Sequence, residues 1–497
     1  MVRFAVSDTA PAARKVSKQF DTTIQSDCYM HALNLCIGYG VGLKENMRSM
    51  QEIDPKTKCR VKRSVVVTQG GEFQEGAQVI RKLRALNKYL LPKFHKLPQL
   101  AALIDVDVRV ASVVKLFQRS IVNYPAFRAY FQNQSEDQED NVFASITASE
   151  WDLIVEMEAI TQRVASLALV ESQSASILSS TMYVLLRIAS ARINSFKFAA
   201  YKLDGPRDED TNERTFSRRE LRFDKLSDLG HRCIKRTLHQ IAFRLPTPSI
   251  QMGMALLLDP RTKKSAKQFL SIPDSADGHT NAILADAEEL LRKEHRFIFQ
   301  AQRLQEKTNN GAIPASTSAP SSPGEVCYIA SDDEMDILCG EQVSLQSEQC
   351  LTDSVLSAEA DALLKKWLDL RIEWADVIKR QYAEDADKRS VVLSKLRTKN
   401  KKGESVWNVE ELCKHVDVCR WFADEGDQQF PSISKLARVW LGRSSSTAFQ
   451  ERVFFTESFV MEPLRTRTDN ERAQQQLVLH HNRKEIEHME NSERAVW

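Results

Sequence analysis

The sequence is dominated by one period. From about Ser149 to Lys202, apolar residues recur at intervals of three and four, the spacing that places side chains on one face of an α-helix. The positions that follow it are Trp151, Ile154, Val155, Met157, Ile160, Val164, Leu167 and Leu169. Further helices are predicted over Tyr29–Gly38, Gln78–Leu91, Ser112–Phe131, Arg218–Phe243, Asn281–Gln305 and Ala358–Tyr382. A chain with this pattern must fold mainly by packing helices together.

Two short segments have the character of strands instead. Residues 2–7 (VRFAVS) are apolar and rich in β-branched side chains, and Asp8 follows directly. Residues 103–110 contain a similar run. The fold class expected is therefore α/β and predominantly helical. A solenoid is not expected, because the sequence shows no internal repeat of about 20 to 50 residues.

A change of composition divides the chain. Residues 307–357 include the run NNGAIPASTSAPSSPGE, which is rich in Pro, Ser, Gly and Asn. Such a segment cannot bury enough apolar surface to offset the loss of chain entropy on folding. We therefore predict a disordered linker between two largely helical parts.

Composition limits the possible functions only loosely. The 497 residues suffice for about three domains. The 69 basic and 67 acidic residues give a net charge of +2, so any contact with nucleic acid must come from local patches. Two basic clusters are candidate nuclear import signals or solvated faces: Arg60, Lys62 and Arg63, and Arg397, Lys399, Lys401 and Lys402.

Cysteine usage and hydropathy point to an intracellular, soluble protein. The nine cysteines have irregular spacing, and the N-terminal segment lacks the apolar core of a secretory signal, so reduced thiols are expected. No stretch approaches the roughly 20 apolar residues of a membrane span, and no membrane partner is expected.

One segment near the C-terminus combines a helix start with an apolar stripe. Ser444–Thr447 offer side-chain oxygens to the unpaired N–H groups of a helix start, and Glu451 falls where the helix dipole favours a carboxylate. Val453, Phe454, Phe459 and Val460 supply the apolar side chains. Periodicity alone favours a helix buried in its own domain over a surface that binds a partner.

The same segment, FPSISKLARVWLGRSSSTAFQERVFFTESFVM (430–461), resembles the C-terminal dimerisation region of hAT-family transposases. The matching residues are Ala437, Leu441, Ser446, Thr447, Ala448, Glu451, Arg452 and Phe454. Gln450 and Phe455 stand where the family has serine. The resemblance implies a homo-oligomer held by Leu436, Leu441, Val453, Phe454 and Phe459.

Other segments resemble the family in the same order along the chain. VRFAVSD ends at Asp8 and is followed by CYMHALNL, which contains Cys28 and His31. DVDVRVASVVKLFQR retains Arg109 and Arg119 but has Val110 where the family has Trp. LLLDPRTKK (256–264) is similar to a motif late in the family's helical insertion.

This collinear resemblance implies a particular domain order. We expect a partial ribonuclease-H-like core over residues 1–120, a helical insertion over 121–306 and the disordered linker over 307–357. A helical segment over 358–428 closes the insertion, and the hAT dimerisation region spans 429–490. The core is thus expected to be split in sequence by a large all-α insertion.

The resemblance also assigns candidate catalytic residues. The family uses Asp, Asp and Glu to hold two divalent cations, and here Asp8 and Glu451 correspond to the second Asp and the Glu. The first Asp has no counterpart. A two-cation site that lacks one carboxylate loses both charge and geometry, so we expect no strand transfer and no cofactor, with Mg²⁺ or Mn²⁺ held by Asp8 and Glu451 only if the protein is active. The alternative is an active cut-and-paste DNA transposase whose N-terminal part lies outside this chain.

Several of these residues have simpler readings. Asp8 can cap the following helix, Cys28 and His31 can be structural, and Asp259 in the DPR turn can be held by its neighbouring arginine. The candidates for DNA contact are Cys28, His31, Arg109, Arg119 and Arg452. The overall expectation is a domesticated, non-enzymatic, transposase-like protein that dimerises and associates with DNA in the nucleus.

Overall fold

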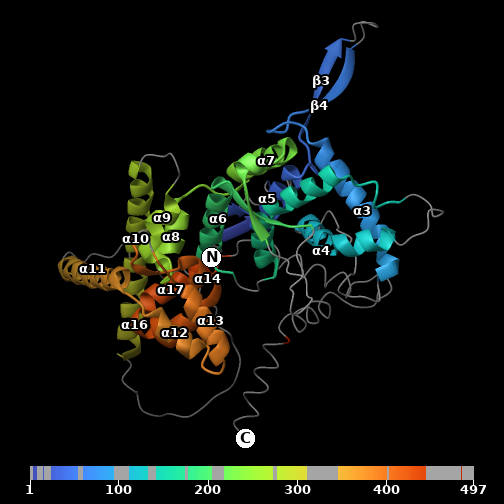
Figure 1. Ribbon diagram of the computed structural model, residues 1–497. Coiled ribbons are helices and arrows are strands. Elements are labelled where there is room, and N and C mark those ends of the chain that lie inside the picture. Colours follow the sequence, from blue (N-terminus) through green and yellow to red (C-terminus); the bar gives the residue numbers. More distant parts are fainter. Residues whose placement is uncertain are drawn as a thin grey trace, which may run out of the picture. The chain divides into compact units, whose positions relative to one another are not determined.

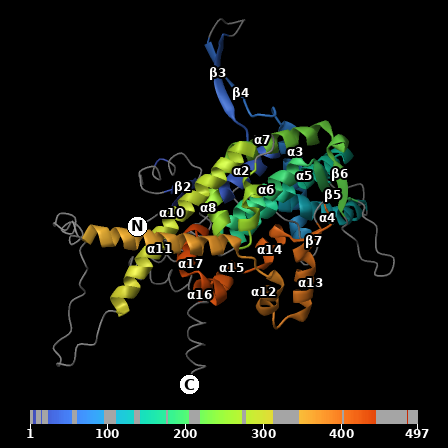
Figure 2. The same ribbon diagram turned by 90° about the vertical axis from the view of Figure 1, so that its left-hand side faces the viewer.

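The structure is a computed structural model. It describes residues 4–7, 15, 24–53, 60–94, 111–132, 141–173, 177–203, 218–271, 277–310, 345–399, 402–443 and 483. In these residues helices predominate and strands are short (Figures 1 and 2). Every sheet in this part of the chain consists of two strands. The predominantly helical α/β class is therefore confirmed.

The chain forms two compact units. Unit 1 comprises residues 1–178, 185–247 and 444–497, and unit 2 comprises residues 179–184 and 248–443. These units are defined by packing, and the predicted domain order stays a prediction. The predicted boundary at residue 120 falls inside a single helix, α4, which packs against α5 in unit 1.

Unit 1 begins with a parallel pair of strands and continues mainly as helices. Its elements are β1 (Phe4–Ser7), β2 (Ile24–Asp27), α2 (Tyr29–Gly40), β3 (Met47–Ile53), β4 (Arg60–Val66), α3 (Gln74–Phe94), α4 (Ser112–Gln132), α5 (Ala148–Gln173), β5 (Lys197–Tyr201), β6 (Arg218–Arg222), η1 (Phe223–Lys225) and α7 (Asp228–Arg244). Helix α6 (Ser179–Asn194) starts in unit 2 and ends in unit 1.

Helix α5 is the centre of unit 1. It packs against α2, α3, α4, α7 and β5, and most of its side chains from Trp151 to Ala168 are buried. The apolar residues that recur at intervals of three and four lie on one side of this helix, where neighbouring elements pack. An apolar helix buried on most sides must lie in the interior, which explains its position.

The carboxylates of α5 are buried only where they have partners. Glu156 accepts hydrogen bonds from the backbone N–H (2.8 Å) and hydroxyl (2.5 Å) of Ser227, the N-cap of α7. Glu158 forms a salt bridge with Arg218 of β6 at 2.8 Å. A buried carboxylate is costly unless such donors compensate it, so these contacts fix α7 and β6 against α5.

Unit 2 is built from helices and one small hairpin. Its elements are α8 (Ile250–Leu258), η2 (Lys263–Ser265), α9 (Ala266–Leu270), α10 (Asp277–Asn310), α11 (Leu345–Asp369), α12 (Trp374–Gln381), α13 (Ala386–Leu396), β7 (Arg397–Lys399), β8 (Ser405–Trp407), α14 (Val409–His415), α15 (Val418–Trp421), η4 (Phe422–Gly426), α16 (Asp427–Gln429) and α17 (Pro431–Leu441). Helix α10 packs against α8, α9, α11 and α17.

Most of the predicted elements that fall in the described residues are confirmed. β1 matches the strand expected over 2–7, and α2, α3, α4 and α10 match four expected helices with small differences at their ends. The strand expected over 103–110 lies outside the described residues. The described residues include one parallel pair, β1 with β2, and the ribonuclease-H-like core stays a prediction.

Several predictions were wrong in detail. Residues 197–201 and 218–222, both expected to be helical, form the antiparallel strands β5 and β6. Phe198 lies opposite Leu221 in this pair and both are buried, so burial of the two side chains outweighs the helical propensity of RRELR. Residues 307–310 and 345–357, expected to belong to the linker, are helical instead, because α10 extends to Asn310 and α11 begins at Leu345.

Candidate functional site

Asp8 and Glu451 lie outside the described residues, as do Arg109, Arg452, Val453, Phe454 and Phe459. Among the residues that are described, no cluster of three or more His, Cys, Asp or Glu side chains is arranged to hold a metal ion. The catalytic assignment is therefore still a prediction.

Three predicted DNA-contact residues are described. Cys28 is fully buried, and it clusters with Met30 and Val6, so its thiol is not placed to touch DNA. His31 is half-buried on α2 and Arg119 is half-buried on α4. Cys28 thus fits the structural reading better than the functional one.

The other buried cysteines are chemically quiet. Burial raises the pKa of Cys36, Cys233 and Cys413 to about 12. These thiols are therefore protonated at neutral pH. Since the thiolate is the reactive form of cysteine, they are poor nucleophiles.

The DPR motif forms a buried ionic lock in unit 2. Asp259 is fully buried and accepts hydrogen bonds from Arg261, through its backbone N–H at 2.9 Å and its guanidinium at 2.7 Å, and from the Ser180 hydroxyl at 2.6 Å. The reading of Asp259 as a turn residue held by its arginine is confirmed. The motif is therefore structural in this part of the chain.

Arg261 connects this turn to remote segments. Its guanidinium also donates to the Thr181 hydroxyl (2.7 Å) and to the carbonyl oxygens of Val416 (2.9 Å) and Cys413 (3.3 Å). The attraction of Asp259 raises the pKa of Arg261 against the opposing effect of burial. One guanidinium thus ties the start of α6, the end of α8 and the end of α14 together.

Lys263 extends the lock to α11. Its ammonium donates to the carbonyl oxygen of Trp367 and lies 3.9 Å from the centre of that indole ring. Burial, aided by the charge of Lys264, lowers the pKa of Lys263 to about 7. The indole nitrogen of Trp367 in turn donates to the carbonyl oxygen of Leu257 at 3.0 Å, so the LLLDPRTKK segment anchors Trp367.

Helix α17 contains two of the predicted dimerisation residues. Leu436 and Leu441 are both buried inside unit 2, where α17 packs against α8 and α10. Trp440, also buried, donates from its indole nitrogen to Glu294 at 2.8 Å, and its carbonyl oxygen accepts from the Ser179 hydroxyl at 2.8 Å. The exposed residues of α17 are instead Pro431, Lys435, Arg438 and Val439.

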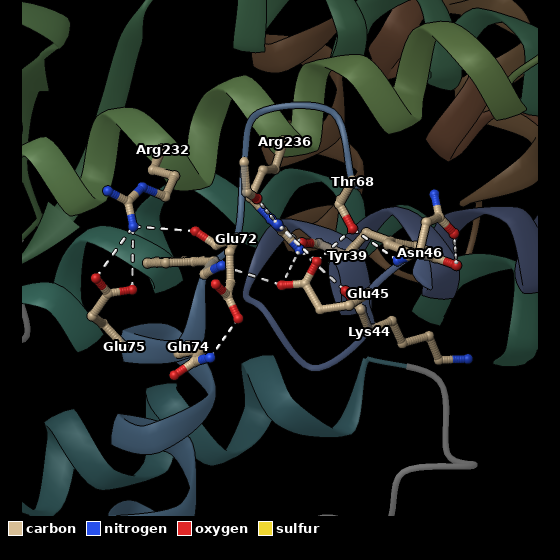
Figure 3. Close-up of polar contacts among 12 residues, drawn as sticks. Tyr39, Lys44, Glu45, Asn46, Thr68, Glu72, Gln74, Glu75, Arg232 and Arg236 are labelled. Atoms are coloured by element: carbon tan, nitrogen blue, oxygen red, sulfur yellow. Dashed lines mark hydrogen bonds and ion pairs between the residues drawn. The ribbon is translucent and has the colours of Figure 1, made fainter. Parts of the chain in front are cut away.

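A second polar network lies in unit 1, at the base of the β3–β4 hairpin (Figure 3). Arg236 of α7 is fully buried, and its guanidinium donates to Glu45 at 3.1 Å, to the carbonyl oxygens of Tyr39 (2.7 Å) and Lys44 (3.1 Å), and to that of Gly71. Glu45 also accepts from the Thr68 hydroxyl at 2.5 Å. Both ends of the hairpin are thereby held to α7.

Two glycines allow this close approach. A Cβ at Gly40 would lie 2.3 Å from the Thr237 hydroxyl oxygen, so the glycine lets α2 and α7 touch. Gly70 has φ +92°, and a Cβ there would lie 2.7 Å from Cγ of Arg236. At these two positions the backbone lies so close to α7 that a side chain would collide with it.

A basic cavity of about 320 Å³ lies beside β5 and β6. Among the described residues that line it, five are basic (Arg163, Arg192, Lys197, Arg218 and Arg219) and one, Glu220, is acidic. Arg218 is engaged by Glu158 and lies 3.8 Å from the centre of the Tyr201 ring. The surplus of positive charge makes this cavity attractive to anions.

Sequence reasoning noticed the basic residues of β4 but missed the hairpin. The signal was present: MRSMQEI and RVKRSVV have strand-like residues, and a Pro-containing segment rich in turn formers separates them. The Arg236 network was missed because its members are far apart in sequence.

Comparison with known proteins identifies the C-terminal part of the chain. Residues 399–483 match the model of the hAT family C-terminal dimerisation region. The match begins earlier than the predicted start at 429 and includes β8, α14, α15, α16 and α17. No curated protein matches the chain in a sequence comparison. Within the described residues, no helix is both long and apolar enough to cross a membrane. The chain thus carries the dimerisation region of the hAT family, which confirms its resemblance to hAT-family transposases.

Proposed function

We propose that this protein is a transposase-like, DNA-associated dimer of the nucleus that does not transfer DNA strands. The match of residues 399–483 to a dimerisation region carries the proposal. The ribonuclease-H-like core is part of it, and the ordered motifs from VRFAVSD to LLLDPRTKK support that core.

Self-association is expected to use the part of the matched region beyond α17. The apolar side of α17 is buried against α8 and α10, so it is occupied within unit 2. The apolar residues of the predicted helix that follows, Val453, Phe454 and Phe459, remain available as the partner surface in this proposal.

DNA association is supported by local positive charge. The whole chain has a net charge of only +2, but the basic cavity beside β5 and β6 and the basic β4 strand concentrate positive groups in unit 1. Such local surpluses are what phosphate contacts require.

The lack of strand transfer is inferred from the carboxylates. The resemblance assigns Asp8 and Glu451 as two of the three carboxylates that a two-cation site needs, so these residues alone are not expected to support strand transfer. The second candidate, an active transposase completed by a preceding segment, is favoured by the order of the motifs.

Two experiments test the proposal. Differently tagged copies of the full chain are expressed together, and one tag is expected to recover the other in defined ratio. The purified chain is then incubated with supercoiled DNA and Mg²⁺ or Mn²⁺, where no nicking or joining is expected. Nicking that disappears in Glu451→Gln would establish the active alternative, and a failure to recover the second copy would contradict dimerisation.

A further inference from the structure

The β3–β4 hairpin stands apart from the helices of unit 1. In both ribbon views its strands project beyond α2, α3 and α7 (Figures 1 and 2). We name residues 47–53 and 60–66 the β3–β4 arm. None of the arm side chains that the structure describes is buried, and Met47 and Met50 are 57% and 46% exposed. A two-stranded ribbon of this kind gains little stability from its own packing, so burial does not explain its presence.

Positive charge is concentrated on the arm. Residues 47–53 and 60–66 contain four lysines and arginines against one acidic residue, a surplus of three, whereas the whole chain has a surplus of two. Arg48, Arg60 and Lys62 are exposed. In the antiparallel register Arg48 pairs with Val65, while Lys62 pairs with Gln51 and Arg60 with Ile53. Because side chains alternate along a strand, Arg48 lies on one face of the ribbon and Arg60 and Lys62 lie on the other.

The base of the arm is fixed. Asn46 precedes β3 and its carbonyl oxygen accepts from the N–H of Val67 at 2.8 Å, directly after β4. The Asn46 N–H donates to the Thr68 hydroxyl at 2.8 Å, and Thr68 is bound to Glu45 and through it to the buried Arg236 (Figure 3). The direction in which the arm leaves the helices is therefore set by a buried ionic network.

We propose that the β3–β4 arm binds double-stranded DNA by entering its major groove. The inference deepens the proposed DNA association by naming the surface and the form of nucleic acid. The major groove of B-form DNA, about 12 Å wide, admits a two-stranded β-ribbon. Strands of seven residues extend about 23 Å, enough to cross the groove.

The chemistry of the arm suits this ligand. Arginine and lysine on both faces can reach the phosphates that border the groove, and such contacts position a protein on the duplex. Exposed Met47 and Met50 provide apolar surface of the kind that contacts thymine methyl groups. Two other occupants fit less well. A second copy of the arm would bring like charges together, and the major groove of A-form RNA is too narrow and deep for a ribbon to read.

The test compares three forms of the full chain with the unchanged protein. In the arm variant, Arg48→Gln, Arg60→Gln and Lys62→Gln remove three charges. In its matched control, Lys365→Gln, Lys366→Gln and Lys395→Gln remove three exposed charges from unit 2. In the third form an Asn-Gly turn replaces residues 47–66, which is feasible because Asn46 and Val67 are already hydrogen-bonded. Fluorescence anisotropy measures binding to a 30-base-pair DNA duplex over a range of salt concentrations.

We expect the arm variant to lose about tenfold or more in affinity near 0.1 M salt, and its plot of log affinity against log salt to flatten by about 2 to 3. The control should bind like the unchanged chain, and the excised chain should bind at least as weakly as the arm variant. The RNA duplex of the same sequence should bind more weakly than DNA and should not respond to the arm substitutions. An unchanged dimer mass and melting temperature show that each form is folded. If the excised chain does not fold, the comparison of the arm variant with its matched control tests the proposal.

The outcomes distinguish the proposal that the arm binds DNA from the more general proposal that the protein associates with DNA. If the unchanged chain binds duplex DNA and the arm variant binds equally well, the arm proposal is wrong while DNA association stands. If the unchanged chain does not bind the duplex, both are wrong. An equal effect of the arm substitutions on RNA and DNA duplexes would overturn the major-groove assignment.

Discussion

The imidazole Nε2 of His295 lies 2.8 Å from the hydroxyl oxygen of Ser432. His295 belongs to α10 and Ser432 to the first turn of α17, and both residues are fully buried. This contact joins the long helix of unit 2 to the segment that matches the hAT dimerisation region. The stability of that segment should therefore respond to the protonation of one histidine.

Acid should destabilise unit 2 between about pH 6.5 and pH 4. Burial lowers the pKa of His295 to about 4, against the opposing charge of Asp361. In the unfolded state the imidazole of His295 therefore binds a proton near pH 6.5, whereas in the folded state it does so only near pH 4. The free energy of unfolding thus falls as the pH falls through this range. The loss attributable to His295 should reach about 2 to 3 kcal/mol.

Urea unfolding followed by tryptophan fluorescence at several pH values measures this loss. His295→Gln, which does not titrate, should remove most of the slope between pH 6.5 and 4, and His279→Gln at an exposed position should leave it unchanged. Identical slopes in His295→Gln and the unchanged chain would refute the assignment.

Breaking the Asp259–Arg261 lock should be among the most destabilising single changes in unit 2. Arg261→Met leaves Asp259 buried without its cation and removes the bonds to Val416 and Cys413, so a loss of about 3 to 5 kcal/mol is expected. Lys379→Met, which breaks an exposed pair with Asp376, should leave the urea midpoint almost unchanged. Comparable urea midpoints for the two variants would contradict the buried lock.

Two adjacent glycines provide a test of the hairpin base. Gly70→Ala and Gly71→Ala both place a side chain at positive φ, but only at Gly70 would the new Cβ meet another residue, Arg236. Gly71→Ala should cost about 1 to 2 kcal/mol from backbone strain, and Gly70→Ala should cost more because Arg236 must shift. Differential scanning calorimetry compares them, and an equal loss of melting temperature would show that Arg236 is not packed against Gly70 in solution.

The sequence predicted what depends on local pattern. The periodic segment over 149–202 predicted α5 and most of α6, and the neighbouring Asp259 and Arg261 predicted their own contact. Both follow from residues within a few positions of each other. The match to the dimerisation region was likewise predicted from a short run of residues.

The remainder depends on distant residues. β6 was predicted to be helical because RRELR has a high local helical propensity. It forms a strand because it pairs with β5, about twenty residues earlier, where Phe198 lies opposite Leu221. The Arg236 network joins positions almost 200 residues apart. The assignment of Leu436 and Leu441 to a dimer surface did not anticipate that α8 and α10 cover that side of α17.

The burial of α17 also changes how dimerisation should be tested. Removing all residues beyond 430 would delete Trp440 and Leu436 from the core of unit 2, and loss of one buried tryptophan side chain alone costs about 3 to 5 kcal/mol. Such a truncation is expected to give insoluble protein, so substitutions are the better probe.

The molar mass in solution, measured by size-exclusion chromatography with light scattering, tests dimerisation most directly. The full chain should have at least twice the mass of one 56.6 kDa copy. Val453→Asp, Phe454→Asp and Phe459→Asp together should reduce it to one copy, while Val391→Asp, Phe243→Asp and Phe297→Asp, at exposed positions outside the matched region, should not. A full chain that elutes with the mass of a single copy would contradict the account.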